Sequence, residues 1–223
     1  MTDKTTTDDL FFTQAGLDRS RLQTIVDDAL VRADDGELFL EYRQSESLLF
    51  DDGRLKSASF DTAHGFGLRA IAGEATGYAH ASELSEAAIL RAAGAVTAVT
   101  RGYSGTQAEP PVGTNRALYP SSNPLDQIDF ATKVKLLADI DAYARGRDAR
   151  VRQVTASLYG EWQAVEIMRP GGQRAADIRP LVRVNVSITV GDGTRLESGS
   201  HGAGGRAAYD TWLDPAHWRG QVD

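Results

Sequence analysis

The segment LVRVNVSITV, residues 181–190, decides the fold class of this chain. From Val182 to Val190, aliphatic residues occupy every even position and polar residues every odd one. A period of two predicts a β-strand with one buried face and one face in water. The turn Gly191-Asp192-Gly193 follows, and a further strand is expected at 194–200.

Strand-like segments recur along the chain and are separated by short turns. Asp52-Gly53 is a hairpin signal, and Pro170-Gly171-Gly172 is a turn. Such short connections favour antiparallel neighbours. The sequence predicts eight strands, at residues 37–50, 54–60, 66–71, 75–80, 151–159, 162–168, 181–190 and 194–200.

Three segments with helical spacing of apolar residues complete the pattern. Helices are expected at 17–34, 82–100 and 129–145, with Asp18, Ser82 and Asp129 as N-caps. The fold class is therefore α+β, with helices packed on antiparallel or mixed sheets. A helix followed by four strands occurs twice, which suggests a duplicated helix-plus-four-strand unit. The domain then runs over 10–213, with possible halves 10–100 and 127–213 joined by the loop 101–126.

The two ends of the chain lack the periodic apolar pattern of this domain. Residues 1–9 are polar and without pattern, so we expect a disordered tail. Asp214-Pro215 is a helix start, and the interpretation of 214–223 is the beginning of a helix that leads into a missing domain. Trp212 and Trp218 are then expected to be exposed, and the segment to be poorly ordered or packed on a neighbouring molecule.

Composition narrows the function classes. There is no cysteine among the 223 residues, which excludes disulfides, thiolate nucleophiles and cysteine-based zinc sites in this chain. The net charge is −7 and basic residues are scattered, so we expect no nucleic-acid partner. No signal peptide or membrane-spanning run is found, so we expect no membrane partner and a cytoplasmic location.

The four histidines give no metal motif. His64, His80, His201 and His217 include no pair at helical spacing, and none is followed by glutamate. His64 and His80 lie in neighbouring expected strands and could face each other, but two histidines without a carboxylate make a poor metal site. We therefore expect no catalytic residue, no metal ligand and no cofactor in this chain.

One glycine-rich stretch follows the last expected strand. Gly202, Gly204, Gly205 and Arg206 match no dinucleotide pattern. They are interpreted either as a flexible turn or β-bulge, or as a place where small residues let another backbone approach closely. In the second case they are peptide or partner contacts, with Arg206 near a carboxylate.

Five stretches carry a resemblance to a known family. They are GFGLRAIAGEATGYAHAS at 65–82, ALYPSSNPLD at 117–126, VRQVTASLYG at 151–160, DIRPLVRVNVSITV at 177–190 and GSHGAGGRAAYDTWL at 199–213. In combination with the order of elements, they resemble the N-terminal portion of the TldD/PmbA family, and the TldD branch more than the PmbA (TldE) branch.

The resemblance implies a peptidase subunit paired with a paralogous PmbA/TldE-type subunit and acting on peptides or unfolded segments. Family members carry a zinc-binding His-Glu-x-x-x-His helix, which the resemblance places downstream of this region. Zinc is thus expected in the full-length protein, and no family ligand maps onto a residue of this chain. Two readings stay open: the non-catalytic N-terminal domain of a zinc metallopeptidase subunit, or a stand-alone binding or regulatory module or PmbA-like inactive subunit.

Overall fold

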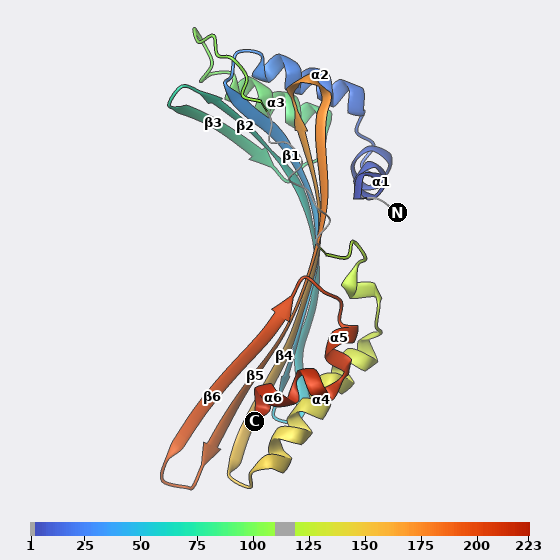
Figure 1. Ribbon diagram of the computed structural model, residues 1–223, viewed down its shortest axis with the longest axis vertical. Helices are drawn as coiled ribbons and strands as arrows, with labels where there is room; N and C mark the ends of the chain where they lie inside the picture. Colours follow the sequence, from blue (N-terminus) through green and yellow to red (C-terminus); the bar gives the residue numbers. More distant parts are fainter. Residues whose placement is uncertain (1–2, 110–118) are drawn as a thin grey trace. The chain divides into compact units, whose positions relative to one another are not determined.

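A single six-stranded sheet runs through the protein. The computed structural model describes residues 3–109 and 119–223. The strands follow the order β3-β2-β1-β4-β5-β6, and each pairs antiparallel with its neighbour (Figure 1). The central pair β1 and β4 is antiparallel because Glu41 meets Gln163 and Asp51 meets Thr155. The strands are β1 Asp35–Asp51, β2 Arg54–Ala72, β3 Ala75–Ala81, β4 Val151–Arg169, β5 Gln173–Gly191 and β6 Leu196–Gly205.

The α+β prediction is confirmed, with six strands in place of eight. The expected strands at 54–60 and 66–71 form the single strand β2, and those at 151–159 and 162–168 form β4. Gly65 and Gly160 lie between these expected strands, yet both are inside continuous strands in the structure. At Gly160 the missing side chain makes room for the Tyr209 ring, so this glycine serves packing instead of a turn. Each expected helix-plus-four-strand unit thus has three strands.

The helices start at side-chain caps. Asp18 caps α2 (Arg19–Leu30) and Asp129 caps α4 (Phe130–Arg147), as expected. The expected helix 82–100 is shorter, because α3 spans Glu86–Val96 and Ser85, in place of Ser82, accepts the amide of Ala88. The remaining helices are α1 Asp3–Thr7, a π-helix Asp8–Gln14, α5 Asp210–Leu213, α6 Arg219–Val222, and 3-10 turns at Pro124–Asp126, Pro170–Gly172 and Pro215–His217.

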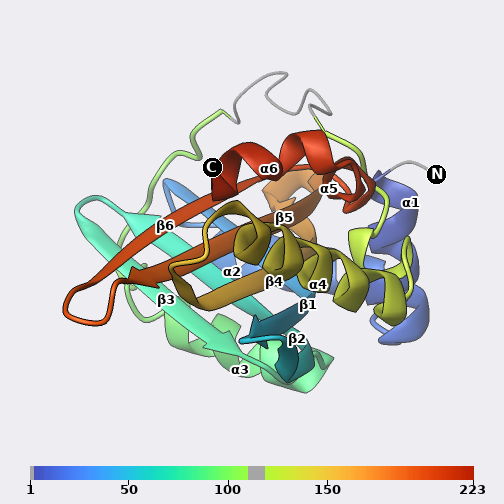
Figure 2. The ribbon, with the colours of Figure 1, turned by 90° about the horizontal axis from the view of Figure 1, so that it is seen from below.

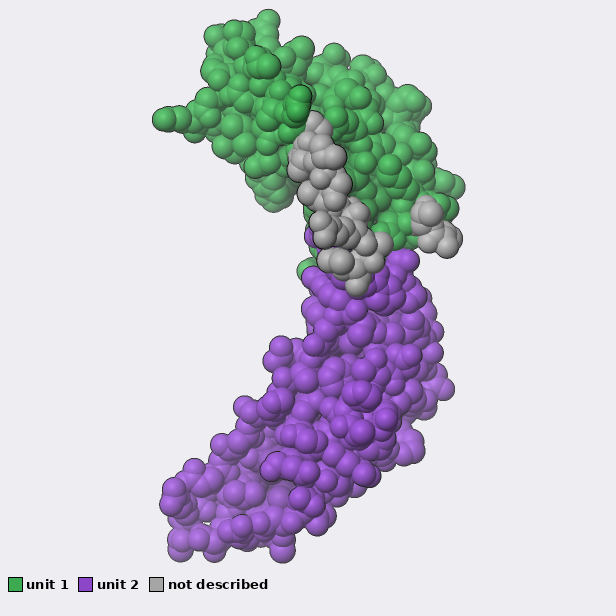
Figure 3. All heavy atoms as spheres, viewed as in Figure 1, with its two compact units in different colours: residues 1–43, 63–118, 163–178 green, residues 44–62, 119–162, 179–223 purple. Residues whose placement is uncertain are grey.

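The described residues fall into two compact units (Figure 3). The first comprises the described parts of 1–43, 63–118 and 163–178, and the second those of 44–62, 119–162 and 179–223. These units do not follow the possible halves 10–100 and 127–213, because β1, β2, β4 and β5 contribute residues to both. The duplication of the element order stays a prediction.

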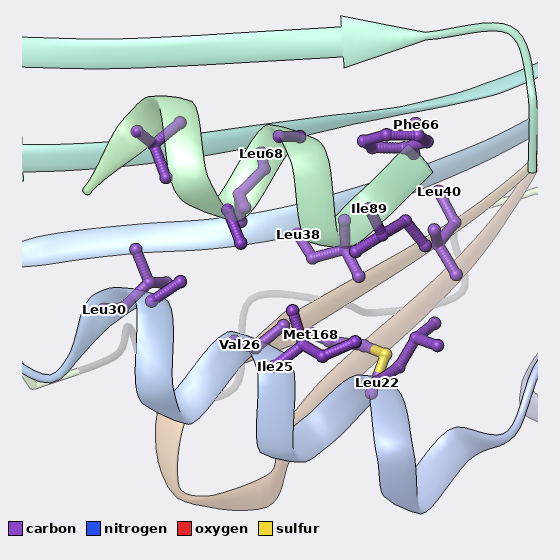
Figure 4. Packing of buried hydrophobic residues seen from close by; sticks show 14 of the residues in the cluster. Leu22, Ile25, Val26, Leu30, Leu38, Leu40, Phe66, Leu68, Ile89 and Met168 are labelled. Carbon is purple, nitrogen blue, oxygen red and sulfur yellow. The ribbon is translucent and has the colours of Figure 1, made fainter. Parts of the chain in front are cut away.

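The core of the first unit lies between α2, α3 and the strands that they cover (Figure 4). Leu22, Ile25 and Leu30 of α2 meet Leu38 and Leu40 of β1 there, all of them buried. Phe66, Leu68, Ile89 and Met168 close the cluster. Apolar burial of this kind is the main favourable contribution to the stability of the unit.

The N-terminal segment is ordered from Asp3, so the expected disordered tail 1–9 is wrong over the described residues. The hydroxyl of Thr7 donates to Glu166, which is fully buried, at 2.7 Å. Arg174 joins Glu166 to Asp8 with two contacts of 2.6 Å. Phe11 is buried in the first core. The residues that hold this segment are thus far away in sequence.

The core of the second unit holds both C-terminal tryptophans. Trp212 and Trp218 are 8% and 3% exposed and pack with Leu137, Ile140 and Val184. The expectation that these side chains are exposed is therefore wrong, and so is that of a poorly ordered end. Asp214 does cap the turn at Pro215 as expected, since it accepts the amide of Ala216. Figure 2 shows α4 and α6 next to one another over the strands of this unit.

The connection 101–126 is described at its two ends. Gly105 donates its amide to Arg32, and Tyr103 donates its hydroxyl to Asp34 at 2.7 Å. At the other end Asn123 caps the turn Pro124–Asp126. Residues 110–118 lie outside the described residues.

Candidate functional site

The predicted contact residues lie on β6, the last strand of the sheet. β6 pairs with β5 from Val182–Gly205 to Gly191–Leu196, and within the described part of the chain no strand pairs with its outer edge (Figure 1). An edge strand presents unpaired backbone N–H and C=O groups on that side. Small and polar residues make up most of β6, and most of them are exposed. This edge is the candidate site.

The glycines of β6 play different parts. A Cβ at Gly204 would come within 3.0 Å of the Cα of Arg183, and one at Gly202 within 2.9 Å of the Arg183 guanidinium. A Cβ at Gly205 meets nothing within 4 Å. The contact of these residues with a peptide or partner stays a prediction, and a close backbone is found at Gly204. At Gly204 that backbone is the neighbouring strand β5.

Arg206 is engaged within the second unit. Its guanidinium donates to the carbonyl of Pro180 at 3.3 Å and lies over the Tyr119 ring at 5.8 Å. Its role toward a carboxylate of a ligand stays a prediction, and the structure points to Arg183 as the cation beside β6.

A polar groove lies along one face of β6. Its volume is about 400 Å³, and Arg183, Asn185 and Ser187 of β5 face Gly204, Gly202 and Ser200 of β6 there. Arg183 donates Nε to the Asn185 side chain at 2.7 Å, and that amide donates to Ser157 at 3.3 Å. The described residues that line it are Thr155, Ser157, Arg183, Asn185, Val186, Ser187, Ser200, His201 and Gly202.

Thr155, which lines the polar groove, is held by the carboxylate of Asp51. Asp51 accepts from the Gln153 amide, Lys56 and the Thr155 hydroxyl at 2.9, 3.0 and 2.8 Å. These hydrogen bonds, that of Gln153 first, lower the pKa of Asp51 from 3.8 to about 2. Asp51 is therefore ionised at neutral pH, and its contacts hold the Thr155 hydroxyl at the groove.

An apolar groove lies along the other face of β6. Val186, Ile188 and Val190 of β5 line it together with Gln221 and Val222 of α6, and its volume is about 390 Å³. The described lining on β6 is Glu197, Ser198, Gly199, Ser200 and His201, with Glu197 opposite Val190 and His201 opposite Val186. Ile188 lies opposite Gly199 in the register, and a Cβ at Gly199 would meet nothing within 4 Å. These residues were not predicted as contacts, although the alternation at 181–190 already separated the two faces of β5.

The histidines are dispersed over both units. His64 and His80 line one pocket of the first unit, about 280 Å³ in volume, together with Glu41 and Arg43. His80 stacks on Tyr78 with ring centroids 5.5 Å apart, and Gln163 donates to Glu41 at 2.6 Å. Across residues 3–109 and 119–223 there is no group of three or more His, Cys, Asp or Glu side chains that could hold a metal. The described residues do not fit a zinc site.

A buried ion pair lies in the second unit, next to the segment that follows β6. Lys133 Nζ lies 2.6 Å from Glu46 and donates to the Leu125 carbonyl at 2.7 Å. The Tyr209 ring, four residues after β6, lies 5.0 Å from Lys133 Nζ. Burial, and then the contact with Glu46, raise the pKa of Tyr209 far above its ordinary value. The pair ties α4, β1 and the segment that follows β6 together.

No helix in the described ranges is long and apolar enough to cross a membrane.

Comparison with known proteins gives matches along most of the chain. The family model for the PmbA/TldA metallopeptidase domain 1 matches residues 36–99, and the model for the central domain matches residues 123–219. A metalloprotease TldD homologue of Haemophilus influenzae is 37% identical over 184 residues, which is 81% of this chain. A TldD homologue of Buchnera aphidicola is 31% identical, again over 81% of this chain. The chain spans 38% of the length of either homologue.

Solved structures share the fold at low sequence identity. TldE from Thermococcus kodakarensis has a TM-score of 0.65 and 14% identity, covering 91% of this chain and 45% of that one. A Bacteroides thetaiotaomicron protein described as a proposed modulator of DNA gyrase has a TM-score of 0.68 and 16% identity, covering 86% and 46%. Both family models describe consecutive domains of one family, and together they match more than two thirds of the chain. The chain belongs to the PmbA/TldD metallopeptidase family and carries its first and central domains.

Proposed function

We propose that this chain is the non-catalytic N-terminal part of a TldD-like zinc metallopeptidase subunit, and that it holds extended peptides or unfolded segments at the β6 edge. The observation that carries the proposal is the unpaired edge of β6 with a groove on either face. Extended peptides add to such edges through main-chain hydrogen bonds, which accept varied side chains. That tolerance suits a peptidase that takes unfolded segments.

Zinc and the groups that act on the peptide bond belong, in this proposal, to the full-length protein. The described residues supply no metal cluster, so this part of the chain contributes binding and position only. A paralogous PmbA/TldE-type subunit is the proposed partner. Support comes from the TldE structure, whose fold matches 91% of the chain. We propose a cytoplasmic location, with neither nucleic acid nor membrane as a partner.

The alternative is a stand-alone binding or regulatory module, or a PmbA-like inactive subunit. The curated relatives favour the TldD reading, since a TldD homologue reaches 37% identity while the TldE structure reaches 14%. Two readouts on the full-length protein separate the readings: chelator-sensitive cleavage of unfolded casein, and about one zinc per subunit. A full-length protein with neither would support the alternative.

Peptide binding is tested by hydrogen exchange of the chain with and without unfolded casein. We expect slower exchange of the β6 amides, residues 196–205, because the added strand pairs with them. β3 is the other outermost strand and serves as an internal control, for which no change is expected. Unchanged exchange at β6, or equal protection of β3, would contradict a peptide site on β6.

A further inference from the structure

The two grooves beside β6 differ in chemistry, and this difference bears on which segments bind. Successive side chains of a strand point to opposite faces of its sheet. A peptide strand added to β6 would therefore send every second side chain toward the apolar groove and the others toward the polar groove. The inference below rests on the proposed peptide site and adds a preference for sequence.

The apolar side has room for aliphatic side chains. Ile188 and Val190 are only half-buried, although they alternate with polar residues like the buried Val182 and Val184. The residue opposite Ile188 is Gly199, which has no side chain to cover it. Gln221 and Val222 line the groove from α6, and Glu197 and His201 of β6 lie on the same face on either side of Gly199. An aliphatic side chain from an added strand would cover apolar surface that is now in contact with water.

The polar side has the opposite character and a positive charge. Arg183 is exposed, and the hydrogen bond recorded for it goes to the neutral Asn185 side chain. Among the described residues that line this groove there is no Asp or Glu. The nearby carboxylate of Asp51 is held by Lys56, Gln153 and Thr155. Charge complementarity therefore favours acidic side chains here, and Ser157, Ser187 and Ser200 offer hydrogen bonds to hydroxyl-bearing ones.

We propose that the β6 edge prefers extended segments in which aliphatic side chains alternate with acidic or hydroxyl-bearing side chains. Segments of the same composition without the alternation bring aliphatic side chains to Arg183 and acidic ones to Ile188. The aliphatic side chains then lie on a polar surface, and the acidic ones lie against an apolar surface. Amphipathic strands exposed by unfolding have this alternation, so the preference fits unfolded β-rich segments.

The test uses two fluorescent ten-residue peptides of equal composition, rich in Leu, Thr and Glu, one alternating and one rearranged in blocks. Fluorescence anisotropy with this chain gives their affinities. We expect the alternating peptide to bind about tenfold more tightly. This ratio corresponds to one aliphatic side chain that is buried in one complex and exposed to water in the other. Equal binding of both peptides with protection of β6 amides would overturn the preference and leave the peptide site standing. Binding of neither peptide would overturn both.

Two variants locate the preference in the grooves. Gly199→Leu fills the apolar groove from β6 itself and should weaken the alternating peptide about tenfold. The matched control is Gly146→Leu on the exposed end of α4, where a Cβ also meets nothing within 4 Å and no change is expected. Arg183→Gln should abolish the preference for a Glu-bearing over a Gln-bearing peptide. Retention of that preference in R183Q, or full binding by a folded G199L, would contradict the assignment.

Discussion

The buried ion pair of Lys133 and Glu46 predicts a large loss of stability when one partner is removed. Lys133 and Glu46 are 3% and 8% exposed, and Lys133 Nζ also donates to the Leu125 carbonyl. Lys133→Met keeps a long unbranched side chain and removes the charge. Glu46 is then left in a buried place without its counter-ion, and the Leu125 carbonyl loses its donor.

The magnitude follows from that geometry. Removal of one partner of a buried pair costs about 3–5 kcal/mol, because the remaining charge is neither hydrated nor neutralised. For a chain of this size each kcal/mol lowers the Tm by roughly 2–4 °C, so a fall of about 6–20 °C is expected. Replacing both partners, as in Lys133→Met with Glu46→Leu, should recover most of the loss, since apolar pairs of similar volume are often as stable as buried ion pairs.

Urea unfolding followed by tryptophan fluorescence measures the effect, and Trp212 and Trp218 in the same core report on it directly. The matched control is Lys135→Met, two residues along the same helix. Lys135 pairs with Asp139 at 2.6 Å, but its side chain is 72% exposed, so a loss within about 1 kcal/mol is expected. Equal losses at Lys133 and Lys135 would refute the reasoning, as would a double variant no more stable than the single one.

Three further predictions concern the edge strand, the groove and the metal. Gly204→Ala should destabilise the chain by about 1–3 kcal/mol because its Cβ meets the β5 backbone, while Gly205→Ala should stay within about 0.5 kcal/mol in the same urea titration. The pKa of Asp51 is depressed to about 2, so its stabilising contribution is present above about pH 4 and is lost as the pH falls toward about 2. Asp51→Asn should therefore be less stable than the parent chain at pH 6. The difference in stability should vanish near pH 2. Metal analysis of the dialysed chain should find far less than one zinc per molecule, and a value close to one would show that a site exists which the described residues do not reveal.

The alternation at 181–190 predicted more than a strand. It placed Val182, Val184 and Val186 in a core and Arg183 and Asn185 on an open face, and the structure confirms both. Period-two patterns succeed here because the strand has one helix-covered face. The grooves could not be predicted without the register of β5 and β6. The pairing of Ile188 with Gly199 and of Asn185 with Gly202 places small residues of β6 beside the two grooves.

Two glycines that lie between expected strands are required for packing and do not end a strand. Gly65 and Gly160 lie in the gaps between expected strands, and glycine between apolar runs commonly marks a turn. In the structure a Cβ at Gly65 would meet the Ala81 carbonyl at 2.7 Å, so this glycine accommodates the neighbouring chain. Such close approaches depend on residues distant in sequence, and no local pattern contains them.

The N-terminal segment follows the same physical rule. Residues 3–9 have no hydrophobic period, and their order comes from Thr7 and Asp8, which reach Glu166 and Arg174 more than 150 residues away. A fully buried carboxylate such as Glu166 needs donors that satisfy it, and here Thr7 supplies one and Arg174 the other. A polar segment at a chain end is predicted to be disordered when its hydrogen-bond partners elsewhere in the chain are not known. Glu166 lies inside a strand that the sequence predicts, and there its carboxylate is buried. A buried carboxylate in a strand therefore indicates that a polar segment elsewhere in the chain packs over it.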